Sequence, residues 1–420
     1  MSRKMKDSGV EWIGKIPETW KISKVKRGFI RKNTKAMIDN PTILSLTSRG
    51  VKIRDITNNE GQIAESYYNY NPVSIGDLLL NPMDLVSNAF SSVSEIEGVI
   101  SPAYVNIKAL NKYYVKYYDY YFKLQYWGLS FFAHGKGVSY ENRWTLNNET
   151  LMNYPIPYPV EEEQILISNY LDKKVFQIDN IISKQKSLIE KYKAYKQSLI
   201  TETVTKGLNK NVPMKDSGIE WIGEIPSHWE IRKVKNGFIR KLSKAMADNP
   251  TILSLTASGV KVRDITNNQG QIAESYYNYN PVSIGDLLLN PMDLVSNAFS
   301  SISQIEGVIS PAYINLKNLK GYNSNYYDYY FKLQYWGLTF FAHGKGVSYE
   351  NRWTLNNETL MNYIIPYPPE KEQRDIALYL NNKCNKIDRV VEKKEKIIEY
   401  LQEYKKSLIY ECVTGKREVN

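Results

Sequence analysis

The stretch AHGKGVSYENR occupies positions 133–143 and recurs unchanged at 342–352. Its two glycines permit close backbone approach to a ligand, and its cations and planar polar side chains can meet phosphates and base edges. The candidates in the first copy are His134, Lys136, Ser139, Tyr140, Asn142 and Arg143, and those in the second are His343, Lys345, Ser348, Tyr349, Asn351 and Arg352. This chemistry fits contact with nucleic acid, although an ordinary polar loop that leads into a helix has a similar composition.

Two further duplicated segments carry side chains of the same kind. SLTSRGVKIRD and LNPMDLVSNAFSS supply Lys52, Arg54, Asn81, Ser87 and Asn88, with the copies Lys261, Arg263, Asn290, Ser296 and Asn297. An arginine such as Arg54 or Arg143 suits bidentate contact with guanine, and an asparagine such as Asn88 or Asn142 suits adenine. The alternative is that about half of these residues are solvated strand faces.

Motifs for catalysis are missing from the sequence. The tetrapeptides NPMD at Asn81 and Asn290 resemble the NPP-aromatic motif of amino-methyltransferases, but they lack its second proline and its aromatic residue. There is no glycine-rich SAM loop before them, no GxxxxGK[ST] phosphate loop and no nucleophile elbow. A PD…ExK nuclease pattern does not stand out, although that pattern is degenerate. His134 and His343 have no nearby Cys, so we expect turn or hydrogen-bonding residues there and no metal site.

The composition is that of a globular protein, with 42% hydrophobic and 24% charged residues among 420. No apolar run approaches the roughly 18 residues of a membrane span, the first residues lack the apolar core of a secretory signal, and Cys384 and Cys412 offer no disulfide framework. We therefore expect a cytoplasmic protein. The net charge of +11 is uneven, because residues 1–160 hold 20 Lys and Arg against 14 Asp and Glu, whereas residues 214–369 hold 14 against 13.

A long internal duplication must position these residues. Residues 5–159 and 214–368 align without gaps at an offset of 209 and differ at 26 of 155 positions. Strand-like runs such as TILSLT and VKIRDIT alternate with turn residues, and YYDYYFKLQYWGL and TLNNETLMNY are typical of helices. Each repeat is therefore predicted to be a mixed α+β domain. The Tyr-rich helices can be core or contact surface.

A long helix is predicted after each repeat, because neither Gly nor Pro occurs at 161–205 or 370–414. Apolar residues at alternating spacings of three and four indicate a heptad seam in both helices. The predicted seam is Ile178, Ile181, Gln185, Leu188, Tyr192, Tyr195 and Leu199 in the first helix, and Ile387, Val390, Lys394, Ile397, Leu401, Tyr404 and Leu408 in the second. Antiparallel pairing of the two helices is the favoured arrangement; the alternative is that each helix packs on its own domain.

Several of these strings resemble one protein family. The opening KDSGxEWIGxIPxxW, the junctions PIPYP…EEQ and PYPPEKEQ, and the helices KKVFQIDNIISKQKSLIEKYKAYKQSLITETVTKG and NKCNKIDRVVEKKEKIIEYLQEYKKSLIYECVTGK are similar to the specificity subunit of type I restriction-modification systems. The resemblance covers nearly the whole chain. It implies target-recognition domains at 1–160 and 214–369, a spacer helix and linker at 161–213, and a second spacer helix at 370–420.

The resemblance also implies fold and partners. The expected fold class is α+β, with two near-identical target-recognition domains in a pseudo-two-fold arrangement, separated by two long antiparallel coiled-coil helices. The expected partners are double-stranded DNA, two methyltransferase subunits and restriction subunits. The chain itself is expected to be non-catalytic and to bind no cofactor, because SAM, Mg²⁺ and ATP belong to the partner subunits.

One departure from the family is functionally important. Its two recognition domains usually differ, whereas the two repeats here are nearly identical, so we expect two similar half-sites in inverted orientation around a spacer. Two alternatives remain open. A structural DNA-binding protein without sequence preference would bind in a way governed by salt alone, and a fused nuclease or methyltransferase would show turnover.

Overall fold

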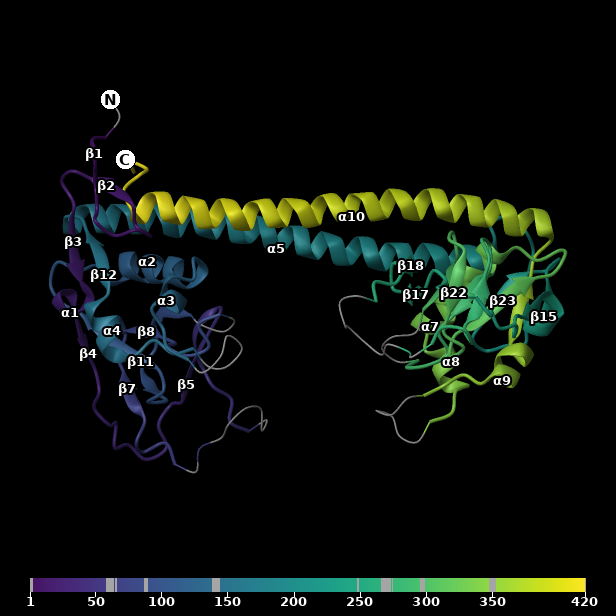
Figure 1. Cartoon of the computed structure of the whole chain (residues 1–420), viewed down its shortest axis with the longest axis horizontal. Coiled ribbons are helices and arrows are strands. Elements are labelled where there is room, and N and C mark those ends of the chain that lie inside the picture. Colours follow the sequence, from purple (N-terminus) through teal and green to yellow (C-terminus); the bar gives the residue numbers. More distant parts are fainter. Residues whose placement is uncertain are drawn as a thin grey trace. The chain divides into compact units, whose positions relative to one another are not determined.

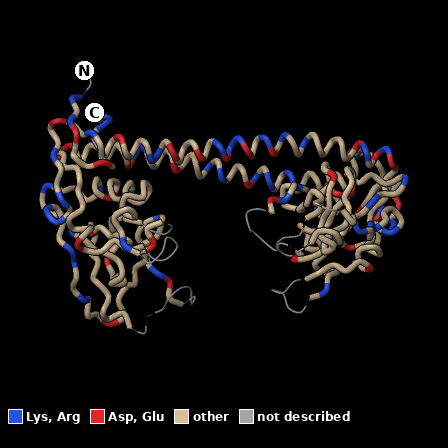
Figure 2. Tube along the Cα trace, in the orientation of Figure 1, with Lys and Arg blue, Asp and Glu red and all other residues tan. Residues whose placement is uncertain are grey.

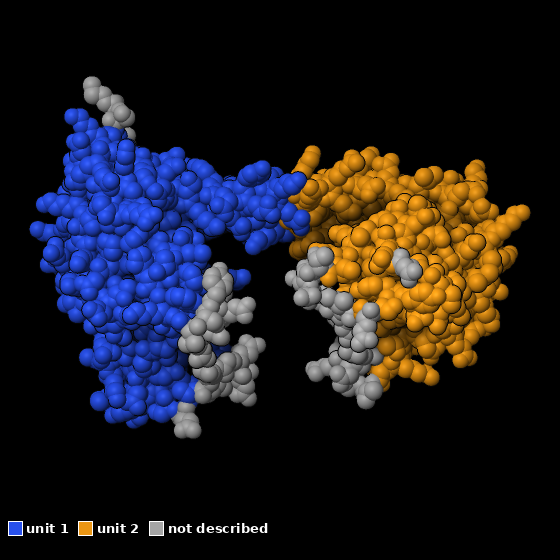
Figure 3. Space-filling model, in the orientation of Figure 1, with its two compact units in different colours: residues 1–186, 395–420 blue, residues 187–394 orange. Residues whose placement is uncertain are grey.

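The structure is a computed structural model that describes residues 3–57, 64, 66–86, 90–137, 144–247, 249–265, 273, 275–294, 299–346 and 353–419. The chain divides into two compact units (Figure 3): unit 1 is Met1–Lys186 with Glu395–Asn420, and unit 2 is Ser187–Lys394. Each unit contains one sequence repeat. Each also contains part of both long helices, α5 (Glu161–Lys206) and α10 (Glu370–Val413).

The repeat in unit 1 consists of short strands followed by helices. Its elements, most of which are labelled in Figure 1, are β1 (Met5–Asp7), β2 (Lys15–Pro17), β3 (Lys21–Lys24), α1 (Val25–Gly28), β4 (Phe29–Arg31), β5 (Leu44–Thr47), β6 (Gly50–Ile53), β7 (Asn71–Val73), β8 (Leu78–Leu80), β9 (Ser91–Val93), β10 (Gly98–Ile100), β11 (Val105–Ala109), α2 (Val115–Trp127), α3 (Ser130–Ala133), α4 (Asn148–Asn153) and β12 (Pro155–Tyr158).

The repeat in unit 2 has the same elements in the same order. They are β13 (Met214–Asp216), β14 (Glu224–Pro226), β15 (Glu230–Lys233), α6 (Val234–Gly237), β16 (Phe238–Arg240), β17 (Leu253–Thr256), β18 (Gly259–Val262), β19 (Asn280–Val282), β20 (Leu287–Leu289), β21 (Ser300–Ile302), β22 (Gly307–Ile309), β23 (Ile314–Asn318), α7 (Ser324–Trp336), α8 (Thr339–Ala342), α9 (Asn357–Asn362) and β24 (Ile364–Tyr367).

An antiparallel four-stranded sheet lies at the centre of each repeat, with the order β4-β11-β8-β9 in unit 1 and β16-β23-β20-β21 in unit 2. All three leucines of β8 are buried, because the strand lies inside the sheet and both of its faces are covered. Two-stranded pairs surround the sheet, and the hairpin β5-β6 is one of them. Lys52 lies in β6 of this hairpin, and Arg54 follows β6 directly.

The Tyr-rich helix α2 belongs to the core. Tyr117, Tyr118 and Tyr121 are buried, and each hydroxyl donates a hydrogen bond to a backbone carbonyl. Burial raises the pKa of all three phenols well above the usual value. Because the hydroxyls are satisfied inside the protein, these rings bury large apolar areas without an unpaired polar group.

The two long helices are antiparallel within each unit. In unit 1, Lys405 of α10 pairs with Asp179 of α5, and Arg417 lies farther along toward the start of α5, next to Tyr170. In unit 2, Lys196 of α5 pairs with Asp388 of α10. The predicted α+β class with two long helices is confirmed. None of the described helices has the length and hydrophobicity that a bilayer crossing requires.

The seam between the helices differs from the predicted one at every second position. Ile181, Leu188, Tyr195, Ile397 and Tyr404 are exposed to solvent by 38–55%, and Val390 is half-buried. The residues that are buried instead follow directly in the chain: Ile182, Ile189 and Ile398. The residues at the other predicted positions are buried or half-buried, namely Ile178, Gln185, Tyr192, Leu199, Ile387, Lys394, Leu401 and Leu408.

The physical reason for this correction is a run of adjacent apolar residues. At 181–182, 188–189 and 397–398 two large aliphatic side chains follow one another, so spacings of three-four and of four-three both give an apolar stripe. Packing against the rest of the unit selects the second residue of each pair. The first residue of each pair is then left on the outer surface of the helices.

Candidate nucleic-acid interface

The base of the AHGKG loop is held by a backbone bridge. Lys136 and Thr145 exchange two N–H···O bonds of 2.9 Å, and Lys345 and Thr354 do the same at 2.9 and 3.0 Å. Both lysines are exposed. The remaining candidates of this loop lie outside the described residues: Ser139, Tyr140, Asn142, Arg143, Ser348, Tyr349, Asn351 and Arg352.

The structure joins this loop to the turn at residues 81–86, which we call the Asn81 turn. The Leu146 N–H donates to the Pro82 carbonyl at 2.8 Å, and the Leu355 N–H donates to the Pro291 carbonyl at the same distance. A Cβ on Gly135 would come within 2.8 Å of the Leu85 Cδ1 atom and within 3.2 Å of the Thr145 carbonyl oxygen, so this glycine lets loop and turn pack closely. The candidates Ser87, Asn88, Ser296 and Asn297 lie outside the described residues.

Asn81 and Asn290 are turn residues, which corrects their predicted role in DNA contact. Each side chain is 7% exposed, and each Oδ1 accepts a hydrogen bond of 3.0 Å from the N–H of the residue two positions later, Met83 or Met292. Such Asx-turns stabilise a change of chain direction. A buried amide in this position is not accessible to a base edge.

His134 and His343 are half-buried and pack against aromatic rings of their own repeats. The His134 Nδ1 lies 2.7 Å from the Ser130 carbonyl oxygen, and its ring lies edge-on to Trp12 with 4.5 Å between centroids. His343 has the same surroundings, with 4.7 Å to the Trp221 ring. Within the described residues no group of three or more His, Cys, Asp and Glu side chains is arranged to hold a metal ion.

The hairpin β5-β6 places Lys52 and Arg54 differently. Lys52 is exposed, whereas Arg54 is half-buried, and its N–H donates to the Ile43 carbonyl at 2.8 Å. Arg54 lies near Tyr104; burial raises the pKa of that phenol, and the positive charge of Arg54 acts in the opposite direction. Lys261, Arg263 and Tyr313 repeat this arrangement in unit 2.

Tyr104 and Tyr313 are members of this surface that the sequence analysis missed. Each tyrosine is within electrostatic range of an aspartate of the adjacent turn, Asp84 or Asp293. The charges of the hairpin arginine and of the Asn81 turn therefore both act on Tyr104. A lone tyrosine in SPAYV has no periodic or motif signal, so only the tertiary structure identifies it.

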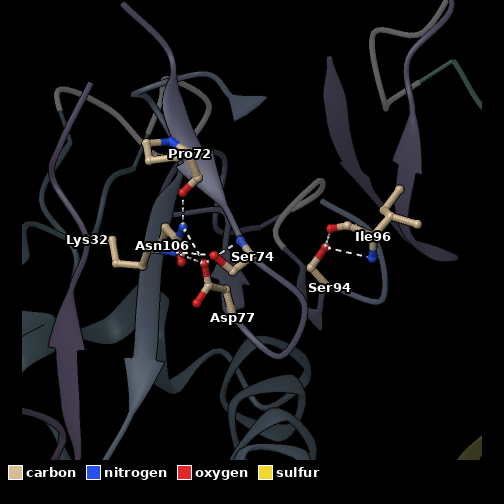
Figure 4. Close-up of polar contacts among 7 residues, drawn as sticks. All are labelled: Lys32, Pro72, Ser74, Asp77, Ser94, Ile96 and Asn106. Atoms are coloured by element: carbon tan, nitrogen blue, oxygen red, sulfur yellow. Dashed lines mark hydrogen bonds and ion pairs between the residues drawn. The ribbon is translucent and has the colours of Figure 1, made fainter. Parts of the chain in front are cut away.

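A buried ion pair supports this end of the repeat (Figure 4). The Lys32 Nζ lies 2.5 Å from the Asp77 Oδ2, and that oxygen also accepts bonds from the Ser74 N–H and the Asn106 amide. Lys241, Asp286, Ser283 and Asn315 form the same network in unit 2. Lys32 is thus held in an ion pair that fixes the chain as it leaves β4.

Comparisons with known proteins agree with the sequence resemblance. No family model matches the chain. The chain is 24% identical over 435 residues to a protein of Methanocaldococcus jannaschii named putative type I restriction enzyme MjaX specificity subunit, which covers 97% of this chain and 96% of that protein. It is also 24% identical over 366 residues to the MjaVIII specificity subunit of the same organism, which covers 82% and 81%.

Two solved structures share the fold. A chain from a structural study of assembly and conformational transition in the type I R-M system has a TM-score of 0.65 at 13% identity, with 95% of this chain and 98% of that chain covered. The HsdS subunit from Thermoanaerobacter tengcongensis has a TM-score of 0.51 at 13% identity, with 98% and 100% covered. In sequence and in fold, this chain is a relative of the specificity subunits of type I restriction enzymes over nearly its whole length.

Proposed function

We propose that this chain is the DNA-recognition and scaffold subunit of a type I restriction-modification enzyme. The observation that carries the proposal is the duplication of one surface, in which the loop base, the Asn81 turn and the hairpin arginine recur in both units with matching hydrogen bonds. The relatives named as specificity subunits support the same role. A surface used twice fits a target that contains the same half-site twice.

The two half-sites are proposed to be similar and inverted. Within each unit the helices are antiparallel, and the ion pair that joins them has its lysine on α10 in unit 1 and on α5 in unit 2. This exchange of roles supports the proposal of inverted half-sites. Readers related by a two-fold axis require an inverted repeat, with centres roughly 10 bp or a multiple of that apart.

For DNA contact we propose the described residues Lys52, Arg54 and Lys136 with their copies Lys261, Arg263 and Lys345. The exposed lysines suit phosphates, which fix position without reading sequence. The half-buried Arg54, held by the hairpin and close to Tyr104, suits a base edge such as guanine. The polar residues of the AHGKG loop that lie outside the described part of the chain remain candidates for the same surface.

The long helices are proposed to dock two methyltransferase subunits, with restriction subunits joining the assembly. Acidic and basic residues alternate along both helices (Figure 2), and apolar side chains are exposed among them. In unit 1 these include Phe176, Ile181, Ile397, Tyr400 and Tyr404, and in unit 2 they include Leu188, Tyr195 and Leu378. Exposed apolar residues with a polar surround are typical of protein interfaces.

The proposal assigns no catalytic role to this chain. The methyltransferase and restriction subunits would carry SAM, Mg²⁺ and ATP, and this chain would position them on DNA. A purified chain that methylates or cleaves DNA without partners would contradict this assignment.

The methylome of cells that carry this chain with its cognate methyltransferase tests the proposal directly. We expect one gapped motif, methylated on both strands, whose two halves are inverted copies or differ at a few positions. Two unrelated half-sites would contradict the proposal that both repeats recognise the same sequence. If the methyltransferase is active and bound but no motif emerges, the chain is a DNA-binding protein without sequence preference.

The helices also provide a test of spacing. If the helices set the distance between the half-sites, removing one heptad from α5 and the matching heptad from α10 should change the preferred spacer length. An unchanged spacer would show that the helices hold partners without measuring the gap.

A further inference from the structure

Unit 1 carries four exposed cations outside the proposed reading residues. They lie in β3 and α1, where the sequence KISKVKR contains no Asp or Glu (Figure 2). Ser23 and Val25 are buried and Ile22 is half-buried, so basic side chains make up the exposed surface of this stretch. We call this surface the β3 basic face, and its members are Lys21, Lys24, Lys26 and Arg27.

The β3 basic face is built on a fixed part of the repeat. β3 pairs with β12 over its whole length, and the Val25 N–H donates to the Tyr154 carbonyl at 3.1 Å. Within the described part of the chain, no side chain of the β3 basic face has a hydrogen bond or an ion pair. Its four positive charges are therefore open to an anionic partner.

The matching stretch of unit 2, EIRKVKN at 230–236, differs at three of seven positions. Glu230 stands where unit 1 has Lys21, and its carboxylate forms an ion pair of 2.8 Å with Arg232. The Arg232 guanidinium also lies 3.7 Å from the centre of the Tyr367 ring. The one cation that unit 2 adds to this stretch is therefore held by a carboxylate and an aromatic ring.

Two further side chains of the unit 2 stretch are bonded within the repeat. Asn236 stands where unit 1 has Arg27, and its Oδ1 accepts a hydrogen bond of 3.0 Å from the Lys233 N–H. The Lys235 Nζ donates to the Asn362 Oδ1 at 2.9 Å. Unit 2 therefore presents less positive charge to a partner at this place than unit 1 does.

This asymmetry between the units spares the residues proposed for reading. Lys52, Arg54 and Lys136 all have identical copies, and residues 131–154 recur without a change at 340–363. A surface that both units need for the same half-site would be kept alike. The β3 basic face therefore suits a contact that only unit 1 makes.

The chemistry of the β3 basic face favours a nucleic-acid backbone over a protein. Protein interfaces have an apolar centre, and within residues 21–27 no large hydrophobic side chain is exposed. DNA phosphates need only cations, whose binding is driven by the release of counterions. β4 follows α1 directly, and the next strand along the chain begins the hairpin that carries Lys52. One repeat therefore carries both the basic face and the proposed reading surface.

We propose that the β3 basic face binds the phosphate backbone of DNA that continues beyond the half-site of unit 1. The matching face of unit 2 makes no equivalent contact, so the complex holds a symmetric target asymmetrically. The inference rests on the proposed function and adds to it a contact that carries no sequence information.

The test measures the affinity of the full chain, in complex with its methyltransferase, for targets that have two identical half-sites and different flanks. The flank is absent, present on one side or present on both sides, and each flank is about 10 bp, one helical turn. The complex can place unit 1 on whichever side has the flank. The first flank should therefore raise affinity about 10-fold more than the second does at low salt, and this difference should shrink as salt increases. Methyltransferase contacts with the flanks should be alike on the two sides and cancel in this comparison.

Exchanging residues between the repeats provides a matched variant, because each set of residues already occurs in a folded repeat. Lys21→Glu with Ser23→Arg and Arg27→Asn gives unit 1 the residues of unit 2, and the two flanks should then have equal effects. Lys116→Asn is the control. It also introduces a residue of the second repeat and removes a cation of unit 1, one that is paired with Asp172, and it should leave the difference between the flanks unchanged.

The reverse exchange in unit 2 is Glu230→Lys with Arg232→Ser and Asn236→Arg, and it should make the second flank as effective as the first. Equal flank effects in the wild type, or unequal effects that survive the exchange in unit 1, would overturn the inference and leave the proposed function standing. Loss of the methyltransferase from the exchanged complex would assign the face to a protein partner and overturn the inference as well. If the wild-type complex does not prefer its target over random DNA, the proposed function fails first.

Discussion

Lys196 on α5 forms an ion pair of 2.7 Å with Asp388 on α10, and its counterpart joins Lys405 on α10 to Asp179 on α5 at 2.6 Å. The second pair is the first with the two helices exchanged. The same exchange governs the anchoring of the repeats, because the Tyr117 hydroxyl donates to the carbonyl of Val413 near the end of α10, and the Tyr326 hydroxyl donates to that of Val204 near the end of α5. Each repeat is completed by the end of the helix that follows the other repeat.

A half-length chain should therefore assemble with itself. Residues 1–212 contain one repeat and all of α5, and two copies can exchange helix ends so that each repeat regains a helix like the one it has in the full chain. We expect a dimer by light scattering, with cooperative unfolding that depends on protein concentration. The variant Tyr117→Phe in the half-length chain should weaken the dimer by about 1 kcal/mol through loss of one hydrogen bond. A well-folded monomer would show that α5 can pack on its own repeat.

The corrected helix seam predicts opposite outcomes for two adjacent isoleucines. Ile182 is 8% exposed and Ile181 is 44% exposed. We expect Ile182→Ala to destabilise the protein by about 2–4 kcal/mol, because it leaves a cavity, and Ile181→Ala to change stability by less than about 0.5 kcal/mol. Urea unfolding measures both.

The exposed Ile181 also provides a test of methyltransferase docking. Ile181→Ala, combined with Ile397→Ala on the neighbouring helix, should reduce copurification of the methyltransferase while the fold is retained. If Ile181→Ala destabilises the chain as much as Ile182→Ala does, the seam predicted from the heptad pattern is the correct one.

The architecture was predictable because it is repeated and periodic. An offset of 209 residues fixes two equal domains whatever their fold, and a stretch without Gly or Pro with apolar residues every three or four positions specifies a long helix. The register of the seam was not predictable, since the pairs Ile181-Ile182 and Ile397-Ile398 satisfy both spacings. Their burial depends on the partner helix, which the local pattern does not contain.

The candidate site was predictable only as a set of segments. The hairpin, the Asn81 turn and the AHGKG loop are recognised by their residue types, but the contacts that unite them are tertiary. Asn81 is a residue type that suits contact with a base, but in the structure its side chain closes a turn. Tyr104 lies among the 34 tyrosines of the chain, and nothing in its sequence neighbourhood separates it from core tyrosines such as Tyr118.

The ion pair between Lys32 and Asp77 should be important for stability. The Asp77 side chain is 2% exposed, and Lys32→Met would leave its carboxylate buried without a counter-ion. We expect a loss of about 3 kcal/mol in the free energy of unfolding. Lys35→Met removes an exposed charge from the same segment and should cost less than about 0.5 kcal/mol. Equal effects of the two variants would mean that water replaces the lysine without penalty.

The hairpin offers a matched pair for DNA binding. Lys52→Ala with Lys261→Ala should weaken binding to all DNA sequences about equally. The slope of log affinity against log salt concentration should become shallower by roughly one for each phosphate that is no longer neutralised. Arg54→Ala with Arg263→Ala should cost about 1–3 kcal/mol for each base that the arginine reads and relax the preference at that position. Titrations at several salt concentrations, on target and random DNA, distinguish the two. An Arg54 variant that weakens all sequences equally would place this arginine on phosphate.

Cys412 predicts a specific dependence of stability on pH. Burial raises the pKa of this thiol to about 12, whereas an unfolded cysteine titrates near about 8.5. Because folding raises the pKa of this thiol, its contribution to the stability of the folded protein is fully present below about pH 8.5. That contribution is lost as the pH rises toward about 12. Above about pH 8.5 the unfolded chain releases a proton that the folded chain keeps, so folding should weaken by up to about 1.4 kcal/mol per pH unit from this group.

The variant Cys412→Ala isolates this effect from the titration of buried tyrosines. At pH 7.5 we expect it to be less stable than the wild type, because a fully buried side chain is shortened. At pH 10 the difference should shrink by about 2 kcal/mol or reverse, since only the wild type carries the thiol. Urea unfolding at the two pH values, in the presence of a reductant, gives both differences. A difference that stays constant between pH 7.5 and 10 would show that the thiol ionises as readily in the folded protein as in the unfolded chain.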